Sequence, residues 1–179
     1  ALGAGAKLVG GSEADDFPEE AKALPDVATF TGASIEAVVA APFGDVRVIT
    51  NHLEWYSLAQ RSAQVEALRT AYADGYAHAR AAEITMNDGG PFQTFVRPRA
   101  TIICGDFNLE HDSALHAKMI SSFLDGTPTL TNPWDKLHPG EPYPTTFCLY
   151  NRIGDHGELH CDFFFVSPEV VQRVESLHV

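Results

Sequence analysis

Residues 102–108 (Ile-Ile-Cys-Gly-Asp-Phe-Asn) hold the side chains that are best placed to do chemistry in this chain. An apolar run of strand length ends there at Gly105, and Asp106 and Asn108 follow two positions apart. Because side chains alternate along an extended backbone, these two polar groups leave the same face. Oxygen-bearing groups at the exit of a buried strand suit the binding of a phosphate, a metal or an attacking water. The alternative is an ordinary turn, in which Gly, Asp and Asn are also common.

Two other apolar runs deliver a polar group in the same way. His52 follows the largely apolar run over residues 46–49 by three positions, and Asp162 comes directly before three phenylalanines. A carboxylate on an apolar strand is costly to desolvate unless it is paired or hydrogen-bonded. We therefore expect a fixed partner for Asp162, such as a histidine or an arginine. The alternatives are a structural role for His52 and an edge position from which the Asp162 carboxylate reaches water.

A hairpin is expected to carry His52. Residues 35–40 and 46–50 each read as a strand, and residues 42–45 read as the turn between them. The pattern predicts that the chain reverses near Gly44-Asp45.

A long helix is expected over residues 57–82, where apolar residues recur at helical spacing. Ser57 and Gln60 match a capping box at its start. Gly75 costs about 1 kcal/mol relative to alanine, so the helix could end or bend there. The other expected elements are strands over 99–104, 158–166 and 174–179, a helix over 114–124, and a long irregular stretch over 125–145 with apolar anchors. Strands that alternate with helices predict an α/β (α+β) class.

Length and composition predict one globular domain over residues 1–179, of which residues 1–33 are weakly patterned apart from a helical turn near 19–24. No apolar stretch approaches the ~20 residues that cross a bilayer, and the start of the chain does not resemble a signal peptide. The net charge of -12 argues against nonspecific binding of duplex DNA, which normally needs a basic surface.

The three cysteines, Cys104, Cys148 and Cys161, form an odd set without zinc-like spacing. Free thiols in a cytoplasmic protein are the simplest interpretation. His156, His160 and Cys161 lie close together, but ligands so crowded rarely make a structural zinc site. A zinc-binding module is therefore disfavoured.

Five short motifs together resemble the endonuclease/exonuclease/phosphatase superfamily of DNase I-like enzymes, in the same order and at similar spacing over residues 34–179. The motifs are Thr50-Asn51-His52-Leu53, Gln60-Arg61 with Gln64-Val65, Ile103-Cys104-Gly105-Asp106-Phe107-Asn108, Pro144-Thr145-Thr146-Phe147, and Asp162-Phe163-Phe164-Phe165-Val166-Ser167. The resemblance implies a four-layered α/β/β/α sandwich, of which this chain would form mostly the second half.

The resemblance also implies a phosphoester hydrolase, more specifically one that cleaves phosphodiesters, in a family of nucleases and phosphatases that use Mg²⁺ or Mn²⁺ as cofactor. Asp106 is similar to the aspartate that activates the attacking water, and Asn108 to the asparagine that orients the nucleophile or the phosphate. His52 is similar to the histidine that contacts the phosphate. Asp162 is similar to the aspartate that holds a second catalytic histidine. Asp106 and Asn108 are the candidate metal ligands.

Two departures from the family pattern bear on activity. The principal metal-binding glutamate is not found in residues 1–33, and the closing Ser-Asp-His segment is missing. We therefore expect an incomplete copy of the domain, short at both ends, that is weakly active or inactive by itself. The leading hypothesis is a metal-dependent phosphodiester hydrolase acting on a small molecule or a lipid head group in preference to duplex DNA. The alternative is a noncatalytic domain that binds a partner, and the oligomeric state stays open.

Overall fold

The computed structural model describes residues 11–12, 26–28, 35–81, 97–147 and 159–178, and the chain divides into two compact units, Ala1–Ile35 and Glu36–Val179. In the first unit, β1 (Gly11–Ser12) pairs in parallel with β2 (Asp26–Ala28). The helical turn expected near residues 19–24 lies outside the described residues. In the part of the chain that is described, no helix is long and apolar enough to span a membrane.

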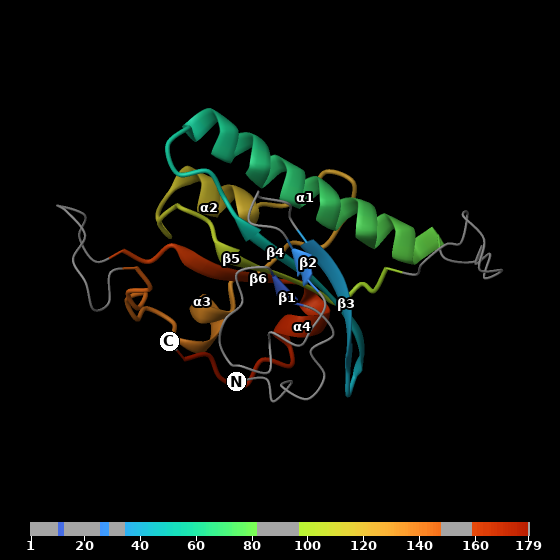
Figure 1. Cartoon of the computed structure of the whole chain (residues 1–179). Helices are drawn as coiled ribbons and strands as arrows, with labels where there is room; N and C mark the ends of the chain where they lie inside the picture. The colour runs from blue at the N-terminus through green and yellow to red at the C-terminus, as the bar shows by residue number, and fades with distance from the viewer. Residues whose placement is uncertain (1–10, 13–25, 29–34, 82–96, 148–158, 179) are drawn as a thin grey trace. The chain divides into compact units, whose positions relative to one another are not determined.

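The second unit is built on a four-stranded mixed sheet (Figure 1). Its strands lie in the order β3 (Ile35–Ala41), β4 (Gly44–His52), β5 (Thr101–Asp106) and β6 (Asp162–Val166). β4 runs parallel to β5, and β6 runs antiparallel to β5. The predicted α/β class is confirmed, and the sheet places the ends of β4 and β5 at the same edge as the start of β6.

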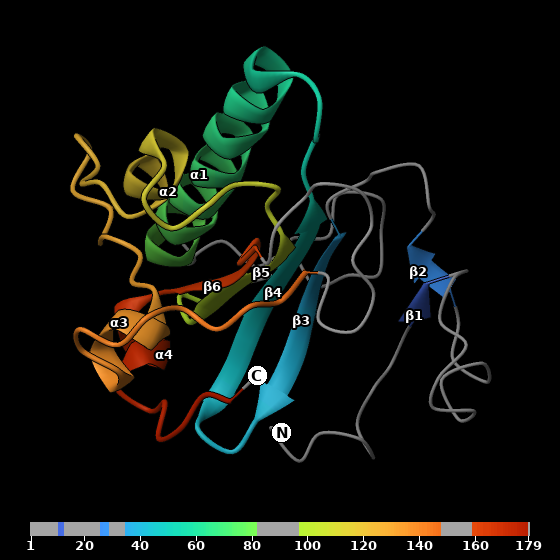
Figure 2. The ribbon, with the colours of Figure 1, turned by 90° about the vertical axis from the view of Figure 1, so that its left-hand side faces the viewer.

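The hairpin forms as predicted, but the chain reverses two residues earlier than expected. Pro42 and Phe43 make the turn, and Gly44 already belongs to β4 (Figure 2). Gly44 has a φ of 117°, which residues with a Cβ rarely adopt. The glycine therefore starts the second strand just beyond the turn, and Asp45 follows it inside β4.

The long helix α1 (Leu58–Ala81) begins where the capping box predicted, since the Ser57 hydroxyl accepts the Gln60 amide at 3.2 Å. It does not end at Gly75. A Cβ at that position would lie 1.5 Å from Nη1 of Arg47, whose side chain is fully buried between α1 and the sheet. The glycine is therefore required by packing, and the helix continues past it.

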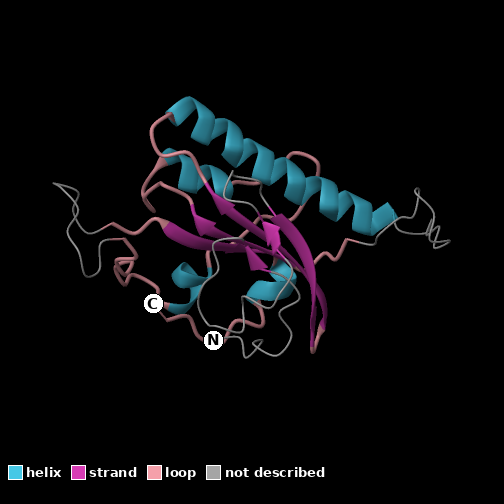
Figure 3. Ribbon diagram, viewed as in Figure 1, coloured by secondary structure: helices cyan, strands magenta, loops and turns pink. Residues whose placement is uncertain are grey.

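The second helix, α2 (Ala114–Met119), is shorter than the expected 114–124 and lies beside α1 over one face of the sheet (Figures 2 and 3). Arg69 of α1 ends it. The Arg69 guanidinium donates to the carbonyl oxygens of Lys118, Met119, Ser121 and Ser122 at 2.7 to 3.3 Å. Carbonyls at and just beyond a helix end have no partner further along the helix, and Arg69 supplies donors to these four.

The main core fills the space between this face of the sheet and the two helices. Its buried side chains come from β4, β5, β6, α1, α2 and the connecting segments; they are Ile49, Leu53, Val65, Leu68, Tyr72, Ile103, Phe107, Leu109, Met119, Leu130, Phe163 and Phe165.

Four other expectations need correction. β5 extends to Asp106 instead of ending at residue 104, because Gly105 and Asp106 still pair with β4 and β6. β6 starts at Asp162, four residues later than expected, and is followed by α4 (Pro168–Val171). Residues 174–178 form no strand. The long 125–145 stretch contains α3 (Pro133–Leu137), which Asn132 caps and which contacts β6.

Candidate active site

His52, Asp106 and Asp162 lie in one row across three neighbouring strands. The register pairs His52 with Asp106 and Asp106 with Asp162. Directly paired residues point to the same face of a sheet, so the three side chains share the face opposite the main core. The sequence indicated that each group stands at a strand end, and the register brings them together.

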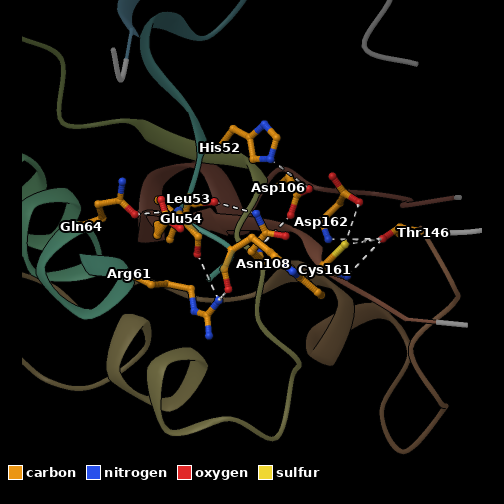
Figure 4. A network of polar contacts seen from close by, with 11 residues as sticks. His52, Leu53, Glu54, Arg61, Gln64, Asp106, Asn108, Thr146, Cys161 and Asp162 are labelled. Atoms are coloured by element: carbon orange, nitrogen blue, oxygen red, sulfur yellow. Dashed lines mark hydrogen bonds and ion pairs between the residues drawn. The ribbon is translucent and has the colours of Figure 1, made fainter. Parts of the chain in front are cut away.

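The imidazole of His52 faces the Asp106 carboxylate (Figure 4). Nε2 of His52 lies 3.6 Å from Oδ2 of Asp106, and the two side chains are 74% and 27% exposed. Oδ1 of Asp106 accepts the backbone amide of Asn108 at 2.8 Å. The carboxylate is therefore held from one side, while the histidine remains open to a ligand from solvent.

Asn108 is fixed by both strands. Its backbone has a φ of 48°, a left-handed conformation that asparagine tolerates better than most residues. Its side-chain Nδ2 donates to the Leu53 carbonyl at 2.6 Å, and the Leu53 amide donates to the Asp106 carbonyl at 2.9 Å. The amide of Asn108 thus ties the segment after β4 to the segment after β5.

Gly105 is what allows the two strands to approach here. It has a φ of 135°, and a Cβ at this position would lie 2.0 Å from the Asn51 carbonyl oxygen. A side chain would therefore push β4 away from β5 next to His52 and Asp106.

Asp162 differs from the expectation in its surroundings. Along β6, Phe163 and Phe165 are buried in the main core, and Asp162 itself is exposed. The alternation of the strand explains this, because Phe163 and Phe165 occupy the core face and leave Asp162 and Phe164 on the opposite face. Within the described ranges Asp162 makes no ion pair with a histidine or an arginine, and its exposure agrees with the alternative, an edge position from which the carboxylate reaches water.

Cys161 and Thr146 support Asp162 instead, and the sequence had suggested no such role for them. The Thr146 hydroxyl accepts the amides of Cys161 and Asp162 at 3.1 and 3.3 Å (Figure 4). The Cys161 thiol lies 3.7 Å from Oδ2 of Asp162. Burial, together with the charges of Asp106 and Asp162, raises the pKa of this thiol to about 12. Cys161 therefore stays protonated and can act as a hydrogen-bond donor between two carboxylates.

A set of contacts braces the segment after His52 against the start of α1. Gln64 accepts the Glu54 amide at 2.8 Å, and Arg61 donates to the Glu54 and Trp55 carbonyls at 3.0 and 2.9 Å. The Glu54 carboxylate in turn accepts the Tyr56 amide at 2.9 Å. Arg61 and Gln64 belong to the sequence motifs, whereas Glu54 was missed; its position between His52 and the helix cap was the available signal.

The residues that are described do not by themselves fit a divalent metal ion. In those ranges no group of three or more His, Cys, Asp or Glu side chains is arranged to hold one. The candidate ligands Asp106 and Asn108 offer one carboxylate and one amide, and Mg²⁺ normally needs six oxygen ligands from protein, water and substrate. The zinc alternative is not supported by His160 and Cys161, and His156 lies outside the described residues.

No protein-family model matches the sequence, and no curated protein matches it significantly. Two of the solved structures to which the chain is similar are the human Nocturnin catalytic domain with bound sulfate anion and truncated Caenorhabditis elegans TDP2. The identities are 20% and 18%, and both TM-scores are 0.48. Each alignment covers 76% of this chain but only 41% and 46% of the other, so the chain spans less than half of either structure.

Proposed function

We propose that this chain carries part of the catalytic site of a phosphodiester hydrolase, in which water attacks phosphorus. The observation that carries the proposal is the row of His52, Asp106 and Asp162 on one face, with Asn108 hydrogen-bonded beside it. An imidazole, an amide and two carboxylates at one strand edge are the groups that such a reaction uses.

In the proposed reaction, Asp106 takes the proton of the attacking water while the water oxygen forms a bond to phosphorus. The bond from phosphorus to the leaving oxygen breaks, and that oxygen finally gains a proton. His52, which is largely exposed, is the donor to a phosphoryl oxygen, where it stabilises the charge that develops. Asn108 holds Asp106 through its backbone amide. Its Nδ2 is fixed by the Leu53 carbonyl, so its Oδ1 is the atom that orients the attacking water.

Asp162 has a supporting role in this proposal. The family resemblance implies that Asp162 holds a second catalytic histidine. In the described residues it is supported by Cys161 and Thr146, which fix the start of β6.

Dependence on Mg²⁺ or Mn²⁺ is also part of the proposal, since the resemblance implies it. Such an ion would supply charge neutralisation at phosphorus. Because the described residues offer too few ligands, further donors have to come from elsewhere. Activity that is lost with EDTA and restored by Mg²⁺ or Mn²⁺ would support this part, and full activity in EDTA would contradict it.

The proposed substrate is a small phosphodiester or a lipid head group. The net charge of -12 disfavours duplex DNA, because neutralising its phosphates requires basic residues. Binding of duplex DNA at micromolar concentration and near-physiological salt would refute this choice. We also propose a cytoplasmic location, because Cys104 and Cys161 are free thiols and thiols stay reduced in that compartment.

Hydrolysis of bis(p-nitrophenyl) phosphate with Mg²⁺ or Mn²⁺ tests the catalytic proposal. We expect Asp106→Asn to lower the rate by about 100-fold or more, as removal of a general base does. Asp112→Asn, at an exposed carboxylate nearby in the sequence, is the matched control and should leave the rate unchanged. A rate for Asp106→Asn equal to that of the wild type would overturn the proposal.

The second candidate function is partner binding by a noncatalytic domain. The shortage of metal ligands among the described residues favours it. Saturable binding of a phosphodiester without turnover in any divalent metal would support this candidate over the hydrolase.

A further inference from the structure

A buried asparagine links the segment before β6 to α2. Asn132 is 3% exposed, and its side chain makes hydrogen bonds in three directions. Oδ1 accepts the Trp134 amide at 3.0 Å and so caps α3. Nδ2 lies 3.1 Å from the Tyr143 hydroxyl and 3.2 Å from Nε2 of His116. We call Asn132, His116, Trp134, Tyr143 and Asp135 the Asn132 cluster.

The direction of each hydrogen bond in the cluster is fixed by its neighbours. The Trp134 amide can only donate, so the atom of Asn132 that faces it is the oxygen. The Tyr143 hydroxyl donates to the Asp135 carboxylate, so its oxygen accepts from the Asn132 amide nitrogen. The second hydrogen of that nitrogen then points to Nε2 of His116. His116 must therefore be neutral, with its proton on Nδ1 and a lone pair on Nε2.

A proton on Nε2 of His116 would place one N–H group against another. The ring cannot escape this contact easily, because it is 4% exposed and packed against aromatic rings. Phe163, Phe165 and Tyr143 lie with their ring centroids 4.9, 5.3 and 6.3 Å away.

We propose that the Asn132 cluster is a pH-sensitive switch in which protonation of His116 releases Asn132, removes the cap of α3 and loosens Tyr143. The effect reaches the start of β6. Tyr143 packs on His160 with a centroid distance of 4.9 Å, and His160 hydrogen-bonds the Pro144 carbonyl. Two residues beyond Pro144, Thr146 holds the amides of Cys161 and Asp162. Acidification thus loosens the support of Asp162.

The charges around His116 are consistent with this switch. Burial lowers the pKa of His116, Asp135 opposes this shift, and His111 and His160 add to it. The β6 residues that face the His116 ring are Phe163 and Phe165, which carry no charge. On α2, the Lys118 ammonium is paired with the Glu66 carboxylate.

The sign of the pH effect follows from the lowered pKa. Below about pH 6.5 the histidine of the unfolded chain binds a proton that the native His116 excludes, so the native state is disfavoured. The folding equilibrium constant therefore falls as the pH falls, until the pH reaches the native pKa. Burial lowers the pKa of His160 as well, so it adds a second contribution of the same sign.

Equilibrium unfolding of the whole chain in urea between about pH 5 and 7.5 tests the proposal through the slope of stability against pH. His116→Gln keeps an acceptor for Asn132 but cannot be protonated. We expect the folding constant of the wild type to fall by up to about tenfold more per pH unit than that of His116→Gln. His111→Gln is the control, since His111 is exposed and stacks on the same Tyr143 ring, and it should keep more of the wild-type slope than His116→Gln.

Equal slopes for the wild type and His116→Gln would overturn the proposal. If His116→Gln fails to fold, ¹⁵N NMR of the wild-type histidine rings decides the question without it. We expect His116 to be protonated on Nδ1 at neutral pH, and the hydrogen-exchange protection of the Trp134 amide to fall on acidification. A His116 proton on Nε2 at neutral pH would refute the proposal. None of these measurements depends on hydrolase activity.

Discussion

Replacing Gly75 by alanine should destabilise this protein, although the same change stabilises most helices. In an exposed helix interior, Gly→Ala gains about 1 kcal/mol. Here the new Cβ would lie 1.5 Å from Nη1 and 2.4 Å from Cζ of Arg47. A guanidinium on the surface would swing aside, but the Arg47 side chain is fully buried against the helix at this point.

The size of the effect follows from what Arg47 would lose. Its Nη1 lies 3.8 Å from the Glu36 carboxylate, and its Nη2 donates to the Tyr72 carbonyl at 3.5 Å. Overpacking a core costs about 1–3 kcal/mol, and a buried charge that is pulled from its partner costs about 3–5 kcal/mol when the separation is complete. Overpacking less the helix gain leaves about 0–2 kcal/mol, and partial separation of Arg47 from Glu36 adds about 1 kcal/mol, so we expect Gly75→Ala to lower the free energy of unfolding by about 1–3 kcal/mol.

A double-mutant cycle measured by urea unfolding isolates this clash. Arg47→Met removes the buried charge and leaves a flexible apolar side chain, while the Glu36 side chain, which is 31% exposed, keeps its ion pair with Arg97 at 3.5 Å. In that background Gly75→Ala should recover up to about 1 kcal/mol of helix propensity. The sign of the Gly75→Ala effect should therefore differ between the two backgrounds. Stabilisation by Gly75→Ala in the wild type would refute the packing argument.

Two further predictions concern the candidate site. Gly105→Ala should lower the free energy of unfolding by about 2 kcal/mol or more. Its φ is positive, and the new Cβ would meet the Asn51 backbone, which cannot move aside as a flexible side chain could. An unchanged urea midpoint would contradict this. The Cys161 thiol, with its pKa raised to about 12, should react with iodoacetamide about 100-fold more slowly in the native protein than in the unfolded chain near pH 8. Equal rates, followed by mass spectrometry of the Cys161 peptide, would show that the thiol is not shielded.

Local pattern predicted the elements of the larger unit well. The capping box fixed the start of α1, and apolar runs located β4, β5 and β6 to within a few residues. Element ends were harder when a distant residue sets them. α2 ends where Arg69 binds its last carbonyls, and that contact joins residues about 50 positions apart.

The burial of charged side chains was the other feature that local pattern did not reveal. Arg47 stands in an apolar strand, where a charged residue is normally expected to face solvent, yet it is fully buried in the same strand as Ile49. The available signal was Gly75 inside the helix, whose missing side chain makes room for the guanidinium. For Asp162 the sequence left open a fixed partner and an edge position that reaches water, and the alternation of β6 exposes it.

The sequence alone supports the grouping of the site residues only as a hypothesis. Each of His52, Asp106 and Asp162 was placed at a strand end by its own apolar run. Their alignment depends on the register of three strands, and register is set by tertiary packing and by the close approach at Gly105.

The central claim is that His52, Asp106, Asn108 and Asp162 form one phosphate-binding site. Titration of the ¹⁵N-labelled chain with inorganic phosphate, with and without Mg²⁺, tests it most directly by NMR. The account predicts that the largest amide shift changes fall on these four residues and their neighbours, and that they weaken in His52→Gln. Saturable shifts that are confined to another part of the molecule would contradict it.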